Sequence, residues 1–204
     1  MWKAELLNTV FGTLSSGVAP VTSSYESIST VTVGSSGSSS ISFTSIPSTY
    51  THLQIRYLAQ TNRSLIIDDA FITINSDTTG ANYYSHQLTG NGSSVSASAS
   101  AGNGGGGQGL FWPYAFLGTA SGSYNYWGVG VIDILDYANT NKYKTLRSLN
   151  GGDGNGASTS GYYPSVNLDS AVWNSTSAIN AITIKSNGNF SQYSSFALYG
   201  IKGS

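Results

Sequence analysis

The residues able to do acid–base chemistry are few and widely spaced in this chain. It has nine carboxylates, two histidines and no cysteine. Asp68 and Asp69 are adjacent, so on a strand their side chains would point to opposite faces, and Asp133 and Asp136, three residues apart, would do the same. Glycoside hydrolysis needs two carboxyl groups held at a set separation across one bond. Nothing in the spacing selects such a pair, and no G-x-S-x-G nucleophile elbow occurs.

Metal-binding patterns are equally sparse. His86 alternates with Tyr84 and Leu88, as on a sheet face, and His52 lies beside a predicted turn at the start of a strand. Neither belongs to an H-E-x-x-H motif or a Cys/His set. The Asp- and Asn-containing stretches 75–80 and 153–156 lack the spacing of a calcium loop. We therefore expect no catalytic residue, no metal and no cofactor, and do not expect an enzyme; a glycan hydrolase is a distant third alternative.

Aromatic side chains are the remaining candidates for recognition. The chain has 14 Tyr and 4 Trp, several of them adjacent. Such side chains stack on sugar rings or anchor interfaces because they combine apolar area with a polar group. On a strand, one member of each adjacent pair is expected to lie in the core. Tyr162 and Tyr163 precede Pro164 at the end of a Gly-rich stretch, so they form the candidate exposed contact loop.

The elements that would position these residues are β-strands. Leu53, Ile55, Tyr57 and Ala59 alternate with polar residues, as a half-buried strand requires. No long helical pattern separates the alternating segments, so we expect an all-β, antiparallel, jelly-roll-like β-sandwich forming one domain over 25–204. The Gly- and Ser-rich stretches 91–109 and 150–161 are expected to be exposed loops. The predicted strands are 27–33, 40–44, 53–60, 70–75, 83–89, 127–137, 143–149, 178–186 and 194–201.

Residues 1–24 differ from the rest and form a predicted N-terminal arm. Their apolar side chains follow helical spacing, and Gly17 and Pro20 end the pattern. A helix this short needs a partner surface. That surface is either its own sandwich or a neighbouring subunit, in which case the segment is a docking arm. The candidate docking residues are Trp2, Leu6, Leu7, Val10, Phe11 and Leu14.

The composition favours an assembly component. Only 8% of the residues are charged, the formal net charge is −1, and Ser, Thr, Asn and Gly account for 96 of the 204 residues. Such a surface has little electrostatic repulsion to keep copies apart. The scattered basic residues do not form a nucleic-acid footprint, and Lys142 and Lys144 fit a solvated edge strand. No apolar run approaches the ~20 residues that span a bilayer, and the N-terminus does not read as an export signal.

Four segments carry a resemblance to known proteins. Residues 40–58 (SISFTSIPSTYTHLQIRYL), 72–94 (ITINSDTTGANYYSHQLTGNGSS), 172–184 (VWNSTSAINAITI) and 192–202 (QYSSFALYGIK) resemble small virion proteins of tailed bacteriophages. The resemblance covers most of 25–204, whereas 1–24 looks like an addition. It implies a virion component, made in the host cytoplasm, without saying which component.

Two functions follow as expectations. The first is a capsid decoration (cement) protein, a homo-oligomer, expected to be a trimer, that binds and stabilises the shell of major capsid protein through the arm. The second is a tail-fibre or receptor-binding module that recognises host surface glycans through Tyr162, Tyr163 or the Gly-rich loops. Neither function calls for a nucleic-acid or membrane partner.

Overall fold

The protein is an all-β sandwich. The computed structural model describes residues 24–101, 109–118, 126–153 and 164–203. These contain twelve strands and a short 3₁₀ turn, Gly80–Asn82. The expected fold class is therefore confirmed. The strands are β1 (Tyr25–Thr32), β2 (Ser38–Phe43), β3 (His52–Thr61), β4 (Ile67–Ile74), β5 (Tyr83–Gly90), β6 (Val95–Ala101), β7 (Leu110–Gly118), β8 (Gly128–Leu135), β9 (Lys144–Gly151), β10 (Val166–Trp173), β11 (Ile182–Phe190) and β12 (Ser195–Ile201).

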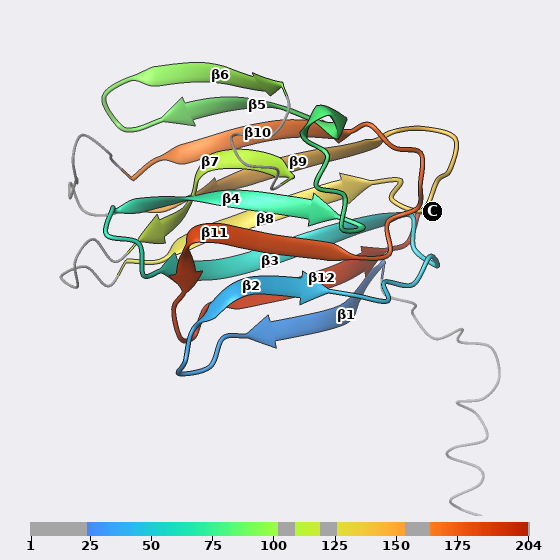
Figure 1. The fold of residues 1–204 in the computed structure, drawn as a ribbon, viewed down its shortest axis with the longest axis horizontal. Coiled ribbons are helices and arrows are strands. Elements are labelled where there is room, and N and C mark those ends of the chain that lie inside the picture. Colours follow the sequence, from blue (N-terminus) through green and yellow to red (C-terminus); the bar gives the residue numbers. More distant parts are fainter. Residues whose placement is uncertain (1–23, 102–108, 119–125, 154–163, 204) are drawn as a thin grey trace, which may run out of the picture.

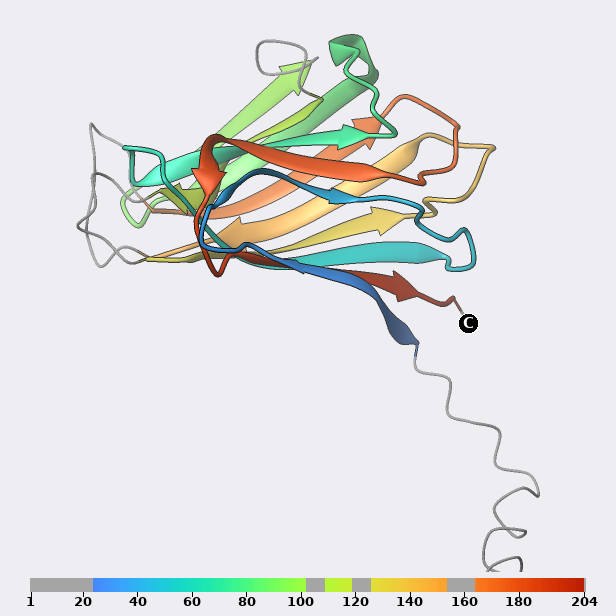
Figure 2. The same ribbon diagram turned by 60° about the horizontal axis from the view of Figure 1, so that its bottom comes forward.

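The strands form two layers, which we call the long sheet and the short sheet. The long sheet has the order β1-β12-β3-β8-β9-β10-β5-β6, and the short sheet β2-β11-β4-β7. The end of β3 joins them, because Gln60 and Thr61 pair in parallel with β7 and Thr61 also pairs with Phe190 of β11. Figure 1 shows the short sheet in front of the long one, and Figure 2 shows the layers from another side.

Eight of these strands have the order and connectivity of a jelly roll, β1-β12-β3-β8 facing β2-β11-β4-β7. Two hairpin insertions enlarge it. β5 and β6 are inserted between β4 and β7, and β9 and β10 between β8 and β11, and all four add to the long sheet. We call β9, β10, β5 and β6 the extension. In Figure 1 its outermost strands, β5 and β6, lie at the top of the molecule.

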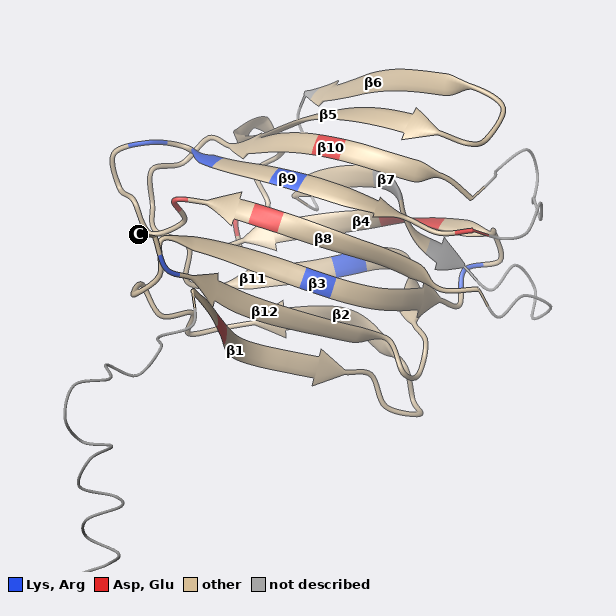
Figure 3. Cartoon of the chain, turned by 180° about the vertical axis from the view of Figure 1, so that it is seen from behind, with Lys and Arg blue, Asp and Glu red and all other residues tan. Residues whose placement is uncertain are grey.

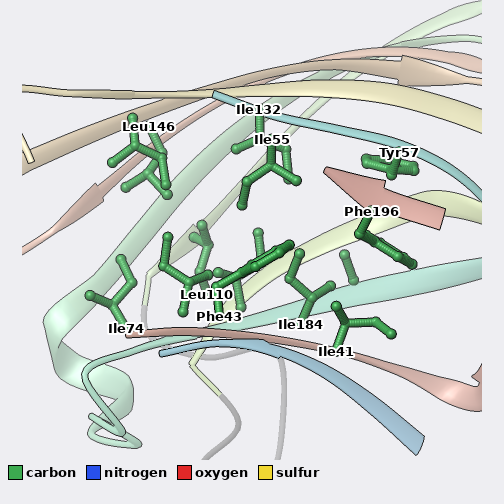
Figure 4. Packing of buried hydrophobic residues seen from close by; sticks show 14 of the residues in the cluster. Ile41, Phe43, Ile55, Tyr57, Ile74, Leu110, Ile132, Leu146, Ile184 and Phe196 are labelled. Atoms are coloured by element: carbon green, nitrogen blue, oxygen red, sulfur yellow. The ribbon is translucent and has the colours of Figure 1, made fainter. Parts of the chain in front are cut away.

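The core lies between the two sheets. Leu53 and Ile55 of β3 are fully buried in this core. Figure 4 shows Ile55 on the side facing Ile184 of the short sheet. An aromatic cluster closes one end, where the Tyr57 ring stacks on Phe196 with 5.6 Å between centroids. Gly130 leaves room for this ring, since a Cβ there would lie 2.4 Å from it. The alternation read from the sequence of β3 thus places its core face correctly.

Three strands were not predicted. β6 lies within a stretch that was expected to be a loop, because its small residues resemble low-complexity sequence. β7 and β10 were also missed, and β11 lies at 182–190 rather than 178–186. In β10 the apolar residues change face midway, Val166 and Leu168 being exposed whereas Ala171 and Trp173 are buried. A simple period-2 template does not match such a strand.

Two predictions about charged residues are wrong. Lys144 is fully buried in a central strand, and its Nζ donates hydrogen bonds to three backbone carbonyls. Asp68 and Asp69 do not face opposite ways, because the register of β4 shifts between Asp68 and Ala70. Arg63 Nη1 lies 3.1 Å from a carboxylate oxygen of each. The two carboxylates hold Arg63 in place and do not form an acid–base pair, since their oxygens already accept hydrogen bonds from the protein.

Candidate functional site

The strands around the extension change the face that carries their apolar residues. At one end of β9, Leu146 points into the sandwich, whereas towards the other end Leu149 points out and Asn150 points in. β10 and β5 repeat this change, so Asp169 and Gln87 are buried while Leu168 and Leu88 are exposed. A half-buried strand normally places apolar residues inside. The outer face of the long sheet is the face away from the short sheet. Because of this inversion, one end of the outer face carries apolar side chains.

The strand registers align these exposed side chains into two continuous rows across the sheet. The first crosses β3, β8, β9, β10, β5 and β6, and the second lies beside it on β8, β9, β10, β5 and β6. Their large side chains on β9 and β10 are about half exposed or more, 58% for Leu149 and 62% for Val166. Together these are the apolar rows: Leu58, Val129, Gly151, Val166, Gly90 and Val95, then Val131, Leu149, Leu168, Leu88 and Ala97.

Charged groups lie beside the apolar rows, and none is a member of either row. A third row lies next to the second, on the side away from the first. It holds Asp133, which pairs with Arg147 at 3.0 Å and accepts a hydrogen bond from Gln54 Nε2 at 2.8 Å. Arg56 stands at the β3 end of the second row, with its guanidinium over the rings of Tyr25 and Tyr199. In Figure 3 the parts of β8, β9, β10, β5 and β6 that carry the apolar rows have no Lys, Arg, Asp or Glu colouring. The arrangement is an apolar area bordered on one side by charged groups, and protein interfaces likewise combine apolar area with adjacent polar residues.

A groove of about 780 Å³ runs along the first row. Val129, Leu149 and Val166 supply its aliphatic lining, and Gly90 to Gly92 and Gly151 leave backbone exposed to it. Pro164 is also part of the lining. A flat apolar face with an open groove suits an extended or broad protein partner better than a compact polar ligand.

The inner face of the same strands carries a buried polar network. Gln87 Nε2 and Asn150 Nδ2 donate to the two carboxylate oxygens of Asp169 at 2.9 and 2.6 Å. Asn167 joins them, donating to Asn150 Oδ1 at 3.0 Å and accepting from Thr89 Oγ1 at 2.8 Å. Burial raises the pKa of Asp169 to about 7, although both amide hydrogen bonds act in the opposite direction. The network fixes which face of these strands points inward, because breaking it would leave buried groups unpaired.

The histidines are placed apart from one another. His86 is exposed on the outer face, on the polar side of the rows, as expected from its alternation. His52 Nδ1 accepts a hydrogen bond from the backbone N–H of Asp136 at 2.9 Å, and so holds the end of β8. Among the described residues no group of three His, Asp or Glu could hold a metal ion. No helix in the same ranges is long and apolar enough to cross a membrane.

The site residues named from sequence lie outside the described ranges. This applies to the arm residues Trp2, Leu6, Leu7, Val10, Phe11 and Leu14 and to Tyr162 and Tyr163. The apolar rows were not predicted from sequence. The signal for them is the change of apolar phase within a strand, visible in β10 as Val-Asn-Leu-Asp followed by Ser-Ala-Val-Trp. Each such switch moves the apolar residues to the other face of the sheet.

The fold and this surface define a class of molecule, a jelly roll whose enlarged sheet carries an apolar outer face. Comparison with known proteins gave no matching family model, no similar curated protein and no similar solved structure. The resemblance to phage virion proteins therefore depends on the sequence segments quoted above.

Proposed function

We propose that this protein is a structural component of a tailed bacteriophage virion, a capsid decoration protein that binds the shell of major capsid protein and stabilises it. The single observation that carries a docking role is the pair of apolar rows on the outer face of the long sheet. Exposed apolar patches rimmed by polar residues mark interaction surfaces. The virion is suggested by the sequence resemblance, and the low charge suits a protein covered by neighbours.

The experiment that tests the virion role is quantitative mass spectrometry of purified particles, combined with immunogold labelling. A decoration protein would be present in a copy number comparable with that of the major capsid protein, and the label would lie on the head. Absence from the particle would refute the virion role. A few copies with label on the tail would refute decoration and favour the fibre alternative.

The N-terminal arm is a second contact in this proposal. Its apolar residues are expected to lie against a neighbouring subunit or the shell, so removal of residues 1–24 would lower the occupancy of the protein on particles. The control is the β1 variant Thr30→Lys, which alters an exposed residue and keeps the arm. Undiminished occupancy of the shortened chain would exclude a docking arm and leave the apolar rows as the contact.

The tail-fibre alternative predicts glycan binding near Tyr162 and Tyr163. The groove beside Pro164 is the feature that favours it. The described lining combines aliphatic residues and glycines with a few polar residues such as Arg56 and Asp153, and its aromatic member, Tyr57, is buried. Sugar recognition by stacking needs an exposed ring, so this lining favours protein docking. A glycan array with host surface polysaccharides tests the alternative, and saturable binding that a Tyr162→Ala, Tyr163→Ala variant loses would support it.

A further inference from the structure

Strand β6 ends the long sheet, and within the described part of the chain no further strand and no charged residue of its own protects its outer edge. Among the described strands it pairs with β5 and has no second neighbour. Residues 95–99 are exposed, which includes both faces of the strand. It contains no charged residue and no proline. Proteins usually protect such edges with Lys, Pro, bulges or a covering segment, because an open edge is a template for another strand.

The opposite edge of the same sheet is protected. β1 carries Glu26, which pairs with Lys202 and accepts a hydrogen bond from Tyr50 at 3.0 Å. Its register with β12 shifts between Ser27 and Ser29, so the pairing of this edge strand is irregular. Both features oppose strand addition. The two ends of one sheet therefore differ, and β6 is the end suited to further pairing.

We propose that β6 pairs with β6 of a second copy of this chain, antiparallel and centred on Ser98. The sequence of the strand, V-S-A-S-A-S-A, is nearly palindromic about this residue. Centring on Ser98 pairs all seven residues and places Ser96 opposite position 100 of the partner and Ala97 opposite position 99. Serine then faces serine and alanine faces alanine at positions 96–100, and Val95 lies opposite position 101, which gives the two-fold, self-complementary contact.

The geometry of this contact also serves docking. Two antiparallel strands within one continuous sheet are related by a two-fold axis perpendicular to it. The outer faces of both copies consequently point the same way, so the apolar rows of both copies can contact the same partner surface. Two linked docking faces bind more tightly than one, because the second engages intramolecularly. The contact is two-fold, in place of the trimer expected from sequence, and it holds with or without the virion role.

Disulfide trapping tests both the contact and its register. The chain has no cysteine, so Ser98→Cys introduces a single thiol. Opposed residues of antiparallel strands have Cα atoms about 4.5–5.5 Å apart, within the range of a disulfide. We expect Ser98→Cys to form a covalent dimer on mild oxidation. The matched control is Ser96→Cys, whose two copies would lie about 13 Å apart along the strands and would not crosslink.

Light scattering on the purified wild-type chain over a concentration series gives the second readout. We expect a limiting mass twice the 21.3 kDa of one chain. Ala99→Lys, which adds a charge to the exposed edge, would remain monomeric, and Thr30→Lys on β1 would still dimerise, with circular dichroism confirming that both fold. A monomeric or trimeric wild type, or equal crosslinking of both cysteine variants, would overturn the proposal. These measurements involve no virion, so their failure is distinct from failure of the proposed function.

Discussion

At the scale of the residue, buried polar groups distinguish this sandwich from an ordinary apolar core. Asp169 is fully buried and held by two amide side chains, and Lys144 is fully buried and held by three carbonyls. The two groups have opposite charges but the same requirement, since a buried charge is stable only with hydrogen-bond partners. Burial of these two residues could not be predicted from residue type, because Asp and Lys are among the residues most often exposed.

Asp169 gives the protein a defined pH dependence. Its pKa is about 7 in the folded state and lies near 3.8 in the unfolded chain. The folded state therefore binds more protons between these values, so the contribution of Asp169 to stability is full below the lower value and is lost as pH rises to the upper one. The loss would be on the order of 4 kcal/mol over this interval.

Chemical denaturation of the wild type and Asp169→Asn at several pH values measures this effect. The asparagine variant cannot ionise, so it becomes more stable relative to the wild type as pH rises towards 7. Taking the difference between the two proteins cancels the carboxylates whose pKa is lowered, such as Glu26 and Asp136. A stability difference that does not change with pH would contradict the assignment.

Lys144 is expected to matter for stability far more than its neighbour Lys142. Replacing Lys144 by Met leaves the carbonyls of Asn139, Lys142 and Thr176 without their donor. We expect a loss of about 3 kcal/mol in the free energy of unfolding. Lys142→Met removes an exposed ion pair with Asp136 and should cost less than about 1 kcal/mol. Equal losses for the two variants would show that the buried ammonium is not a structural anchor.

At the scale of the element, β3 keeps one apolar phase and was predictable from sequence, β5 and β9 change phase and were still predicted, and β10 changes phase and was missed. β3 keeps its core residues at Leu53, Ile55, Tyr57 and Ala59 throughout, and its position follows from sequence. β10 changes phase at Ser170, and β6 has side chains too small to mark a core face. The sandwich class was therefore accessible from alternation, whereas the extension and the apolar rows depend on which strands become neighbours.

The inversion in β10 predicts opposite outcomes for two adjacent residues. Leu168→Ser removes an exposed side chain, so the free energy of unfolding should change by less than about 0.5 kcal/mol. Asn167→Ala breaks buried hydrogen bonds with Thr89 and Asn150 and should cost roughly 2–3 kcal/mol. Urea denaturation compares the two. A larger loss for Leu168→Ser than for Asn167→Ala would mean that the faces are assigned the wrong way round.

At the scale of the whole molecule, the extension enlarges one sheet of a two-layer jelly roll and so widens its outer face. Both the core eight strands and the four added strands bury apolar residues between the sheets, and the added strands also present Leu149, Leu168 and Leu88 outward. Docking through such a face relies on apolar area, since charged groups lie at its border. The low number of charged residues thus predicts that docking would depend on apolar contacts and not on ion pairs.

Salt dependence tests this property on particles that carry the protein. Apolar contacts are not screened by ions, whereas surface charge pairs are. We expect occupancy on the particle to stay constant as sodium chloride is raised to moderate concentrations, measured by sedimentation and gel densitometry. Release of the protein over this range would indicate an electrostatic contact and would place the docking surface elsewhere.

Docking through the apolar rows is tested by measuring how much of each variant binds to particles stripped of the protein. Leu149→Asp with Leu168→Asp places two charges within the apolar rows, and Ser170→Asp adds a charge on the same strand outside them. All three residues are exposed, so the variants are expected to fold. We expect the double variant to fail to rebind and Ser170→Asp to rebind as the wild type does. Rebinding of the double variant at the wild-type level would contradict docking through these rows.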